Sequence, residues 1–193
     1  MNRIKHYVLV LLCATPLLAQ AAMPGMKGVQ HIGFTVPSVD EAVTFFVDVI
    51  GCEAFHTIGP FGPFSDNWMT ENLNVNKKAV IKVAQMVRCA NGTNFEIFEY
   101  QSPDQKKEFV KNSDLGGNHI AFYVEDMDDA VKYLKSKGVR ILGEPHLFTD
   151  TGMKGLTWVY FLTPWGQQLE IVSYPEGQAY EQSTNRRLWD PRQ

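Results

Sequence analysis

Two histidines are candidates for a chemical role because of their residue type and their spacing in the sequence. His31 and His119 lie 88 residues apart, each near the start of a matching apolar segment, QHIGFTV at 30–36 and NHIAFYV at 118–124. A lone histidine at the start of a strand is most often an edge residue with no chemical role. Because the histidine recurs at the same place in an internal duplication, metal ligation becomes the better interpretation.

Two glutamates recur in the same way. Glu96 and Glu170 lie in FEIFEY at 95–100 and LEIVSY at 169–174, an offset of 74 residues. Taken singly, a glutamate in an apolar strand usually points to water. Strand alternation, however, places each glutamate on the same face as a large apolar residue, and neither segment contains a Lys or Arg that could neutralise it. We therefore expect both carboxylates on the concave face of a curved sheet.

Two imidazoles and two carboxylates form a suitable donor set for one divalent cation. Their charges balance a 2+ ion, and an octahedral ion keeps positions open for water or substrate. Open positions distinguish a catalytic metal site from a structural one. We predict that one divalent ion (Zn, Ni, Co, Mn or Fe) is bound by His31, Glu96, His119 and Glu170.

The elements that must position these residues repeat in the order β-α-β-β-β. The hydrophobic patterns predict strands at 28–36, 52–58, 79–88, 94–100, 117–124, 139–146, 156–162 and 167–174, and helices at 39–50 and 127–137. The expected fold is α+β, with two tandem βαβββ modules that form a curved mixed sheet around the metal site. The modules are expected at 28–101 and 117–175, with a linker at 102–116 and a polar tail at 176–193.

A loop and a cysteine pair leave alternatives open. Residues 59–69 are rich in Gly and Pro and contain three aromatic residues, which favours a substrate-covering loop over a decorative insertion. Cys52 and Cys89 fall at matching ends of a predicted antiparallel hairpin. They form either a disulfide, in an oxidising compartment, or two buried thiols.

The N-terminus predicts a secretory signal peptide at residues 1–21. Two basic residues precede an apolar run at 7–18, and Ala-Gln-Ala at 19–21 provides a cleavage site. The alternative is that Met23 or Met26 is the true start. The run is too short for a permanent membrane anchor, so we expect a periplasmic or secreted protein with no membrane association once mature.

The composition and net charge of the chain indicate which classes of binding partner to expect. Hydrophobic content of 45% and charged content of 20% are ordinary for a folded protein of 193 residues. A net charge of −3 without runs of Lys or Arg argues against nucleic acid and anionic lipid as partners.

The chain resembles the vicinal oxygen chelate superfamily, which contains glyoxalase I, methylmalonyl-CoA epimerase, bleomycin-resistance proteins, extradiol dioxygenases and fosfomycin-resistance enzymes. The resemblance covers about residues 28–175 and rests on the duplicated β-α-β-β-β order, with a His on the first strand and a Glu on the last strand of each half. It implies the same four metal ligands, and Glu96 as the fourth implies the glyoxalase I and epimerase branch. Segments 112–119 and 160–166 are also similar to cyclitol epimerases of the epi-valiolone type.

The resemblance implies a mechanism. In that branch the metal acts as a Lewis acid on two adjacent substrate oxygens and stabilises an enediolate, while a glutamate moves the proton. By similarity, either Glu170 or Glu96 is that base. Glu99 is expected to face solvent on the opposite side of its strand, and His56 and His146 are expected to be solvent-facing strand residues.

We therefore expect a metal-dependent epimerase or isomerase that transfers a proton α to a carbonyl. A secreted member is expected to act on a free hydroxy-ketone, a sugar or cyclitol, or an aldehyde-derived substrate, because glutathione and CoA conjugates are mainly cytosolic. The alternatives are glyoxalase I (lactoylglutathione lyase) and a non-catalytic protein that binds an antibiotic or toxin. The two modules either pair within one chain or exchange partners in a homodimer.

Overall fold

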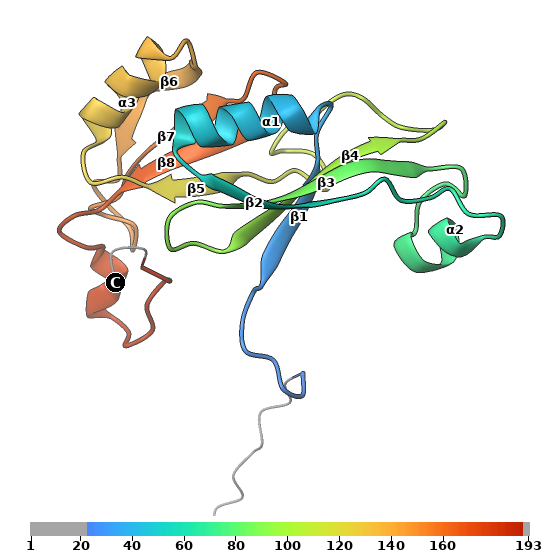
Figure 1. The fold of residues 1–193 in the computed structure, drawn as a ribbon. Coiled ribbons are helices and arrows are strands. Elements are labelled where there is room, and N and C mark those ends of the chain that lie inside the picture. Colours follow the sequence, from blue (N-terminus) through green and yellow to red (C-terminus); the bar gives the residue numbers. More distant parts are fainter. Residues whose placement is uncertain (1–22, 191–193) are drawn as a thin grey trace, which may run out of the picture.

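Eight strands in residues 23–190, the part of the chain that the computed structural model describes, form two four-stranded mixed sheets (Figure 1). The predicted signal peptide at 1–21 lies outside these residues. The first sheet has the order β1-β4-β3-β2 and the second the order β5-β8-β7-β6, so the two modules repeat one topology. The strands are β1 (His31–Thr35), β2 (Glu53–Ile58), β3 (Val80–Arg88), β4 (Asn94–Gln101), β5 (Ile120–Tyr123), β6 (Arg140–Leu147), β7 (Thr157–Leu162) and β8 (Gln168–Ser173).

The first and last strands of each module are neighbours. β1 pairs in parallel with β4, and β5 pairs in parallel with β8, whereas the other pairs are antiparallel. The predicted fold class, α+β from two tandem βαβββ modules, is confirmed. This topology brings the His-bearing start of each module beside its Glu-bearing end.

The two long predicted helices both form. The first comprises α1 (Val39–Phe45) and η1 (Phe46–Ile50), where the helix widens into a π-helix. Ser38 accepts a hydrogen bond from the backbone N–H of Glu41 at 3.2 Å, and the chain leaves at Gly51 with φ of 88°. The second, α3 (Met127–Ser136), is capped in the same way by Asp126.

Two short helices were not predicted. α2 (Trp68–Leu73) begins at the end of the Gly- and Pro-rich loop, where Asp66 Oδ1 accepts from the backbone N–H of Trp68 at 3.0 Å. It ends at Asn74, which takes the left-handed conformation with φ of 53°. The 3₁₀ turn η2 (Ala179–Gln182) follows β8, so the expected polar tail is partly structured.

One hydrophobic core joins the two modules on the helix side of both sheets. Phe46 is fully buried, and the Trp165 ring of the second module packs 5.6 Å from the Phe45 ring, measured between centroids. At the same boundary, the Tyr133 hydroxyl donates to the Val49 carbonyl at 3.0 Å. In Figure 1, α1 lies above the strands of the first sheet, beside the second module. The helix faces are therefore used to hold the modules side by side, which leaves the opposite sheet faces open.

Cys52 and Cys89 form a disulfide. It joins the residue before β2 to the residue after β3, whose ends are paired through Glu53 and Arg88. The alternative of two free thiols is thus wrong, and the disulfide closes the end of the hairpin that lies next to η1.

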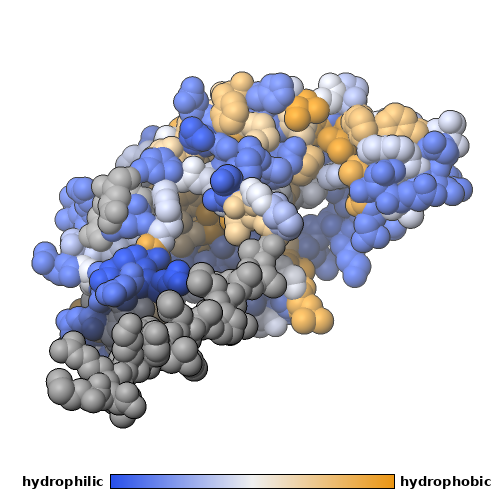
Figure 2. Space-filling model, turned by 90° about the horizontal axis from the view of Figure 1, so that it is seen from below, coloured by the Kyte–Doolittle hydropathy of each residue, from blue (hydrophilic) through white to orange (hydrophobic). Residues whose placement is uncertain are grey.

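Large apolar side chains are exposed at several places along the chain, from Met23 to Trp189. Figure 2, seen from the side away from α1, shows a mainly polar surface with hydrophobic residues towards the end that carries α2. Phe55, Ile58 and Phe64, in β2 and the loop after it, are among the large apolar side chains exposed to solvent. None of the helices in residues 23–190 is long and apolar enough to cross a membrane.

Candidate metal centre

The first module brings His31 and Glu96 together. The two side chains project from the neighbouring strands β1 and β4, and His31 Nε2 lies 3.2 Å from Glu96 Oε2. Gly33, opposite Glu96 in the strand register, leaves space there, because a Cβ on it would lie 3.3 Å from the Phe98 ring and 4.0 Å from Glu96 Oε2. A side chain at Gly33 would therefore press on the Phe98 ring, whereas its distance from the carboxylate would be an ordinary contact.

The second module repeats this pair. His119 directly precedes β5, and its Nε2 lies 3.0 Å from Oε2 of Glu170 on β8. Ala121 stands opposite Glu170, at the position equivalent to Gly33. The side chains of this second pair are more covered, at 35% and 12% exposed against 43% and 21% in the first pair. The predicted duplication is therefore a duplication of a histidine–glutamate contact.

Strand alternation explains which face carries the pairs. Phe95 and Ile97 flank Glu96 and are buried in the core beneath α1, and Leu169 and Ile171 flank Glu170 in the same way. Glu96 and Glu170 therefore lie on the face away from the core. That this face is the concave one stays a prediction.

Burial changes the acidity of Glu170. Its pKa is raised by loss of solvation, and the neighbouring His119 opposes that rise only in part. The pKa of Tyr160, which faces Glu170 across β7 and β8, is also raised, chiefly by burial and then by the charge of Glu170. A carboxylate with a raised pKa is a stronger base, so Glu170 is suited to accept a proton.

The four predicted ligands form two pairs in this single chain. Within residues 23–190, no three His, Cys, Asp or Glu side chains are grouped so that they could hold a metal ion. The modules meet through their helices and Trp165, so each sheet presents its own pair on its open face. That all four residues share one ion stays a prediction, and it requires the open faces of two modules to be brought together.

An aromatic row extends the second pair along the open face of its sheet. Tyr160 lies 5.1 Å from His119 and 4.9 Å from Trp158, and Trp158 lies 5.8 Å from His146, all between ring centroids. Phe148 stacks on Trp158 at 6.3 Å. This row was not predicted from the sequence, although Trp158 and Tyr160 alternate in a strand paired with that of Glu170 and would have indicated it.

The first module has a different surface at the same place. Met86 stands opposite Glu96, where Tyr160 stands opposite Glu170. His56 pairs with Met86 and is exposed, as expected. His146 is exposed as expected, but it also takes part in the aromatic row. The open face of the second module is therefore the aromatic one.

The prediction for Glu99 is wrong. Its side chain is only 13% exposed, accepts from the backbone N–H of Val39 at 3.1 Å and forms an ion pair with Lys82. Lys82, and to a lesser extent the Val39 N–H, lower the pKa of Glu99, while burial opposes them. Glu99 does face away from Glu96, but that side of the strand lies under the start of α1 and not in water.

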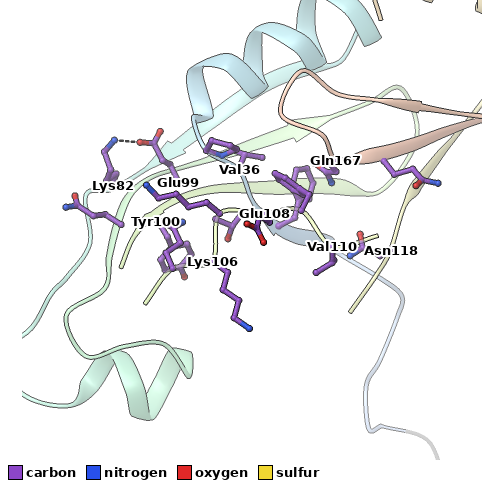
Figure 3. A pocket seen from close by; sticks show the side chains of 17 residues that line it. Val36, Lys82, Glu99, Tyr100, Lys106, Glu108, Val110, Asn118 and Gln167 are labelled. Atoms are coloured by element: carbon purple, nitrogen blue, oxygen red, sulfur yellow. Dashed lines mark hydrogen bonds and ion pairs between the residues drawn. The ribbon is translucent and has the colours of Figure 1, made fainter. Parts of the chain in front are cut away.

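Glu99 and Lys82 also line a cavity of about 530 Å³ beside the end of β1 (Figure 3). Its walls come from the end of β1, from β4, from linker residues 105–110 and from Gln167 and Gln168. None of the four predicted ligands lines this cavity. The cavity and the histidine–glutamate pairs are therefore separate features of the fold.

The loop at 59–69 packs mainly on itself. The rings of Phe61, Phe64 and Trp68 lie 4.9–5.3 Å apart in edge-on contacts, and Phe61 forms a two-bond bridge with Ile81. Met69 is fully buried. A substrate-covering role for this loop stays a prediction.

Two tandem βαβββ modules, each with a histidine–glutamate pair on its open face, define a protein of the glyoxalase-like fold. The chain belongs to the glyoxalase/bleomycin resistance protein/dioxygenase superfamily, whose family model matches residues 30–156. It is 45% identical over 170 residues to a 2-epi-5-epi-valiolone epimerase from Actinomyces sp., covering 88% of this chain and 91% of that protein. The predicted superfamily and the predicted similarity to cyclitol epimerases are confirmed, and the chain is an enzyme of this superfamily.

Solved structures agree on the fold. A glyoxalase family protein from Enterococcus faecalis matches with a TM-score of 0.54 at 18% identity, covering 76% of this chain and 98% of that one. The trypanothione-dependent glyoxalase I of Leishmania major matches with a TM-score of 0.52 at 16% identity, covering 82% and 93%. At these identities the matches show the shared fold alone.

Proposed function

We propose that this enzyme is a metal-dependent epimerase that inverts the carbon next to the carbonyl of a keto-cyclitol. The observation that carries the proposal is the duplicated histidine–glutamate pair, in a chain 45% identical to a 2-epi-5-epi-valiolone epimerase. Inversion next to a carbonyl requires a base for an acidified C–H bond and return of a proton from the other side. The two carboxylates, each on its own sheet, supply groups for both steps.

The residues fit a divalent cation when both pairs are combined. One pair offers one imidazole nitrogen and one carboxylate oxygen, which is too few ligands for the usual four to six positions. Both pairs offer two nitrogens and two oxygens, from His31, His119, Glu96 and Glu170, with positions left for substrate oxygens. When bound there, the ion supplies Lewis acidity that polarises the substrate carbonyl and acidifies the adjacent C–H.

A second copy of the chain is the proposed means of combining the pairs. In a two-fold dimer, the open face of the first module of each chain would meet the open face of the second module of the other, which gives two equivalent sites. The helix-side core stays intact in this arrangement, because each chain keeps its modules side by side through Phe46 and Trp165.

Mixing two inactive variants tests this dimer. His31→Ala disables every first module and His119→Ala every second module, so only mixed dimers contain an intact site. After random reassociation of equal amounts, about one quarter of the sites should regain metal and activity. If mixing restores nothing while each variant remains folded, sites shared between chains are excluded.

Glu170 is the proposed base. Its pKa is raised by burial in the metal-free protein, which would suit it, when it is not bound to the ion, to take the proton from the substrate carbon. Glu96 would relay a proton from solvent to the opposite face, and Glu170 would then release its proton to solvent. The aromatic row beside Glu170 gives the substrate ring a flat apolar wall, with Trp158 and Tyr160 at its centre. Removal of the proton next to the carbonyl would leave the substrate as an enediolate, as expected for this kind of proton transfer.

Deuterium incorporation tests the function directly. Purified enzyme with a measured metal content is incubated in D₂O with 2-epi-5-epi-valiolone, and both the recovered substrate and the product are examined by NMR. We expect about one metal equivalent per chain, deuterium at the carbon next to the carbonyl, and the epimeric product. Absence of exchange by metal-loaded enzyme would refute the proposal, and turnover of methylglyoxal with glutathione instead would favour a glyoxalase I activity.

We also propose that the enzyme is exported. The support is the charged, apolar and small-residue order of residues 1–21, together with the Cys52–Cys89 disulfide, because disulfides persist in oxidising compartments. Cell fractionation and N-terminal sequencing of the processed protein test this proposal. A cytoplasmic protein that retains Met1 would contradict it.

A further inference from the structure

Each of the two histidines lies between a carboxylate and an amide side chain. On His31, Nε2 faces Glu96 while Nδ1 donates to the side-chain oxygen of Gln30. On His119, Nε2 faces Glu170 while Nδ1 lies 3.2 Å from Asn112 Nδ2. The order amide, imidazole, carboxylate is therefore repeated in both modules.

The amide beside Nδ1 affects whether the histidine can bind a cation through Nε2. An imidazole that gives its Nε2 lone pair to a cation carries its ring proton on Nδ1, so the group beside Nδ1 must accept a hydrogen bond. Gln30 already presents its oxygen to His31. Asn112 presents its NH₂ group, and a half-turn of the amide about its last bond exchanges NH₂ for oxygen in the same place.

The second amide does not come from the duplicated position. By the repeat, the residue equivalent to Gln30 is Asn118, which also directly precedes its histidine. The side chain of Asn118 instead donates to the Gly116 carbonyl at 3.0 Å. Asn112, from the linker between the modules, takes the place beside His119.

The linker is built to hold Asn112 there. The backbone N–H of Lys111 donates to Asp114 Oδ2 at 2.8 Å, and the N–H of Gly117 donates to the Asp114 carbonyl at 2.8 Å. A Cβ on Gly117 would lie 2.2 Å from the Lys111 carbonyl oxygen, so the turn requires glycine at this position. The turn therefore fixes the backbone at Asn112, whose side chain reaches His119.

We propose that Gln30 and Asn112 are positioning residues that hold His31 and His119 in the orientation and tautomer needed to bind a divalent cation through Nε2. The inference rests on the proposed metal site. It adds that the linker at 102–116 is part of that site, because it supplies the amide for the second module.

The test compares four forms of the full chain: wild type, Asn112→Ala, Asn112→Asp and the matched control Asn118→Ala. Affinity for Zn²⁺ is measured by competition with a chelator, and ¹⁵N NMR reports which ring nitrogen of His119 carries the proton. Asn112→Ala should weaken Zn²⁺ binding about 10–100-fold. Asn112→Asp should retain binding, because a carboxylate can only accept, and Asn118→Ala should bind like wild type. Gln30→Ala and Gln30→Glu should repeat the contrast at His31.

The outcomes separate this inference from the proposed function. If wild type binds Zn²⁺ and Asn112→Ala binds equally well, the positioning role is refuted while the metal site stands. If wild type binds no divalent cation, the metal site fails. The NMR measurement on the metal-free protein still decides the contact, because the carboxylate of Asn112→Asp can only accept a hydrogen bond from Nδ1. This variant should bring a proton to Nδ1 of His119, and a ring protonated on the same nitrogen as in wild type would refute the contact. Equal losses in Asn112→Ala and Asn118→Ala would show a general disturbance of the linker and would also overturn the inference.

Discussion

Replacing Glu170 by Gln should separate its proposed role as a base from its cost to the stability of the fold. The substitution keeps the size of the side chain, which is 12% exposed, and leaves an oxygen near His119 Nε2. It removes the charge, whose burial raises the pKa of this carboxyl. Glu96→Gln is the comparison variant, because it makes the same change at the other proposed ligand, in the more exposed pair.

Activity and stability should change in opposite directions. Loss of a general base lowers the rate about 10²–10⁴-fold, equivalent to roughly 2.7–5.4 kcal/mol in the activation barrier. Because the folded protein holds the Glu170 proton more tightly than the unfolded chain, the stability of the metal-free protein falls as pH rises through the folded pKa. Glu170→Gln removes that fall, so the metal-free variant should be more stable than wild type at neutral pH.

Two assays test the proposed role of Glu170 as a base and the effect of its burial on stability. Deuterium exchange is measured at saturating substrate and normalised to bound metal, and thermal unfolding is followed with EDTA from about pH 4 to pH 8, a range chosen to span the ordinary glutamate pKa. Exchange by Glu170→Gln within ten-fold of wild type, or a larger loss in Glu96→Gln, would remove Glu170 from the role of base. A neutral-pH stability below that of wild type would refute the burial argument.

Three further predictions concern the scaffold. Phe46→Ala should cost about 3–5 kcal/mol in urea unfolding, because it empties the centre of the core shared by both modules; a cost under about 1 kcal/mol would contradict that position. Reduction of Cys52–Cys89, which closes a loop with a separation of 37 residues, should cost up to about 4 kcal/mol by the chain-entropy relation; an unchanged urea midpoint would refute it. Glu99 has a lowered pKa, so it stabilises the fold above its ordinary pKa and this stability is lost as pH falls through the lowered value. Glu99→Gln should therefore unfold at a higher pH than wild type on acidification, and coincident acid transitions would count against the Lys82 contact.

Alternation and repetition were enough to predict most of the fold. The pattern of apolar residues predicted all eight strands and both long helices, because recognisable residues bound it, such as the cap Ser38 and the terminating Gly51. It missed α2, since the helix starts where Gly and Pro had just ended regular structure. It also missed the π-helical turn η1, whose residues fit the ordinary helical spacing.

The candidate site was predictable within each module and not between modules. Alternation assigns Glu96 and Glu170 to the face away from the core, and the repeat identifies the histidine beside each. How the two faces lie relative to each other in one chain depends on the packing of Phe45 and Phe46 against Trp165, a contact between distant segments that no local pattern encodes. Glu99 was misjudged for the same reason, because the position of the helix above its strand decides its burial.

The difference between the two open faces bears on stereochemistry. Two identical halves would admit a ring molecule equally well in either of two orientations related by a half-turn, and a catalyst of that kind could not distinguish one end of its substrate from the other. With a thioether at Met86 and a phenol at Tyr160 opposite the two carboxylates, the halves are no longer equivalent. A site assembled from them has a defined direction, and this is what an enzyme needs in order to invert one chosen centre among several similar carbinol carbons.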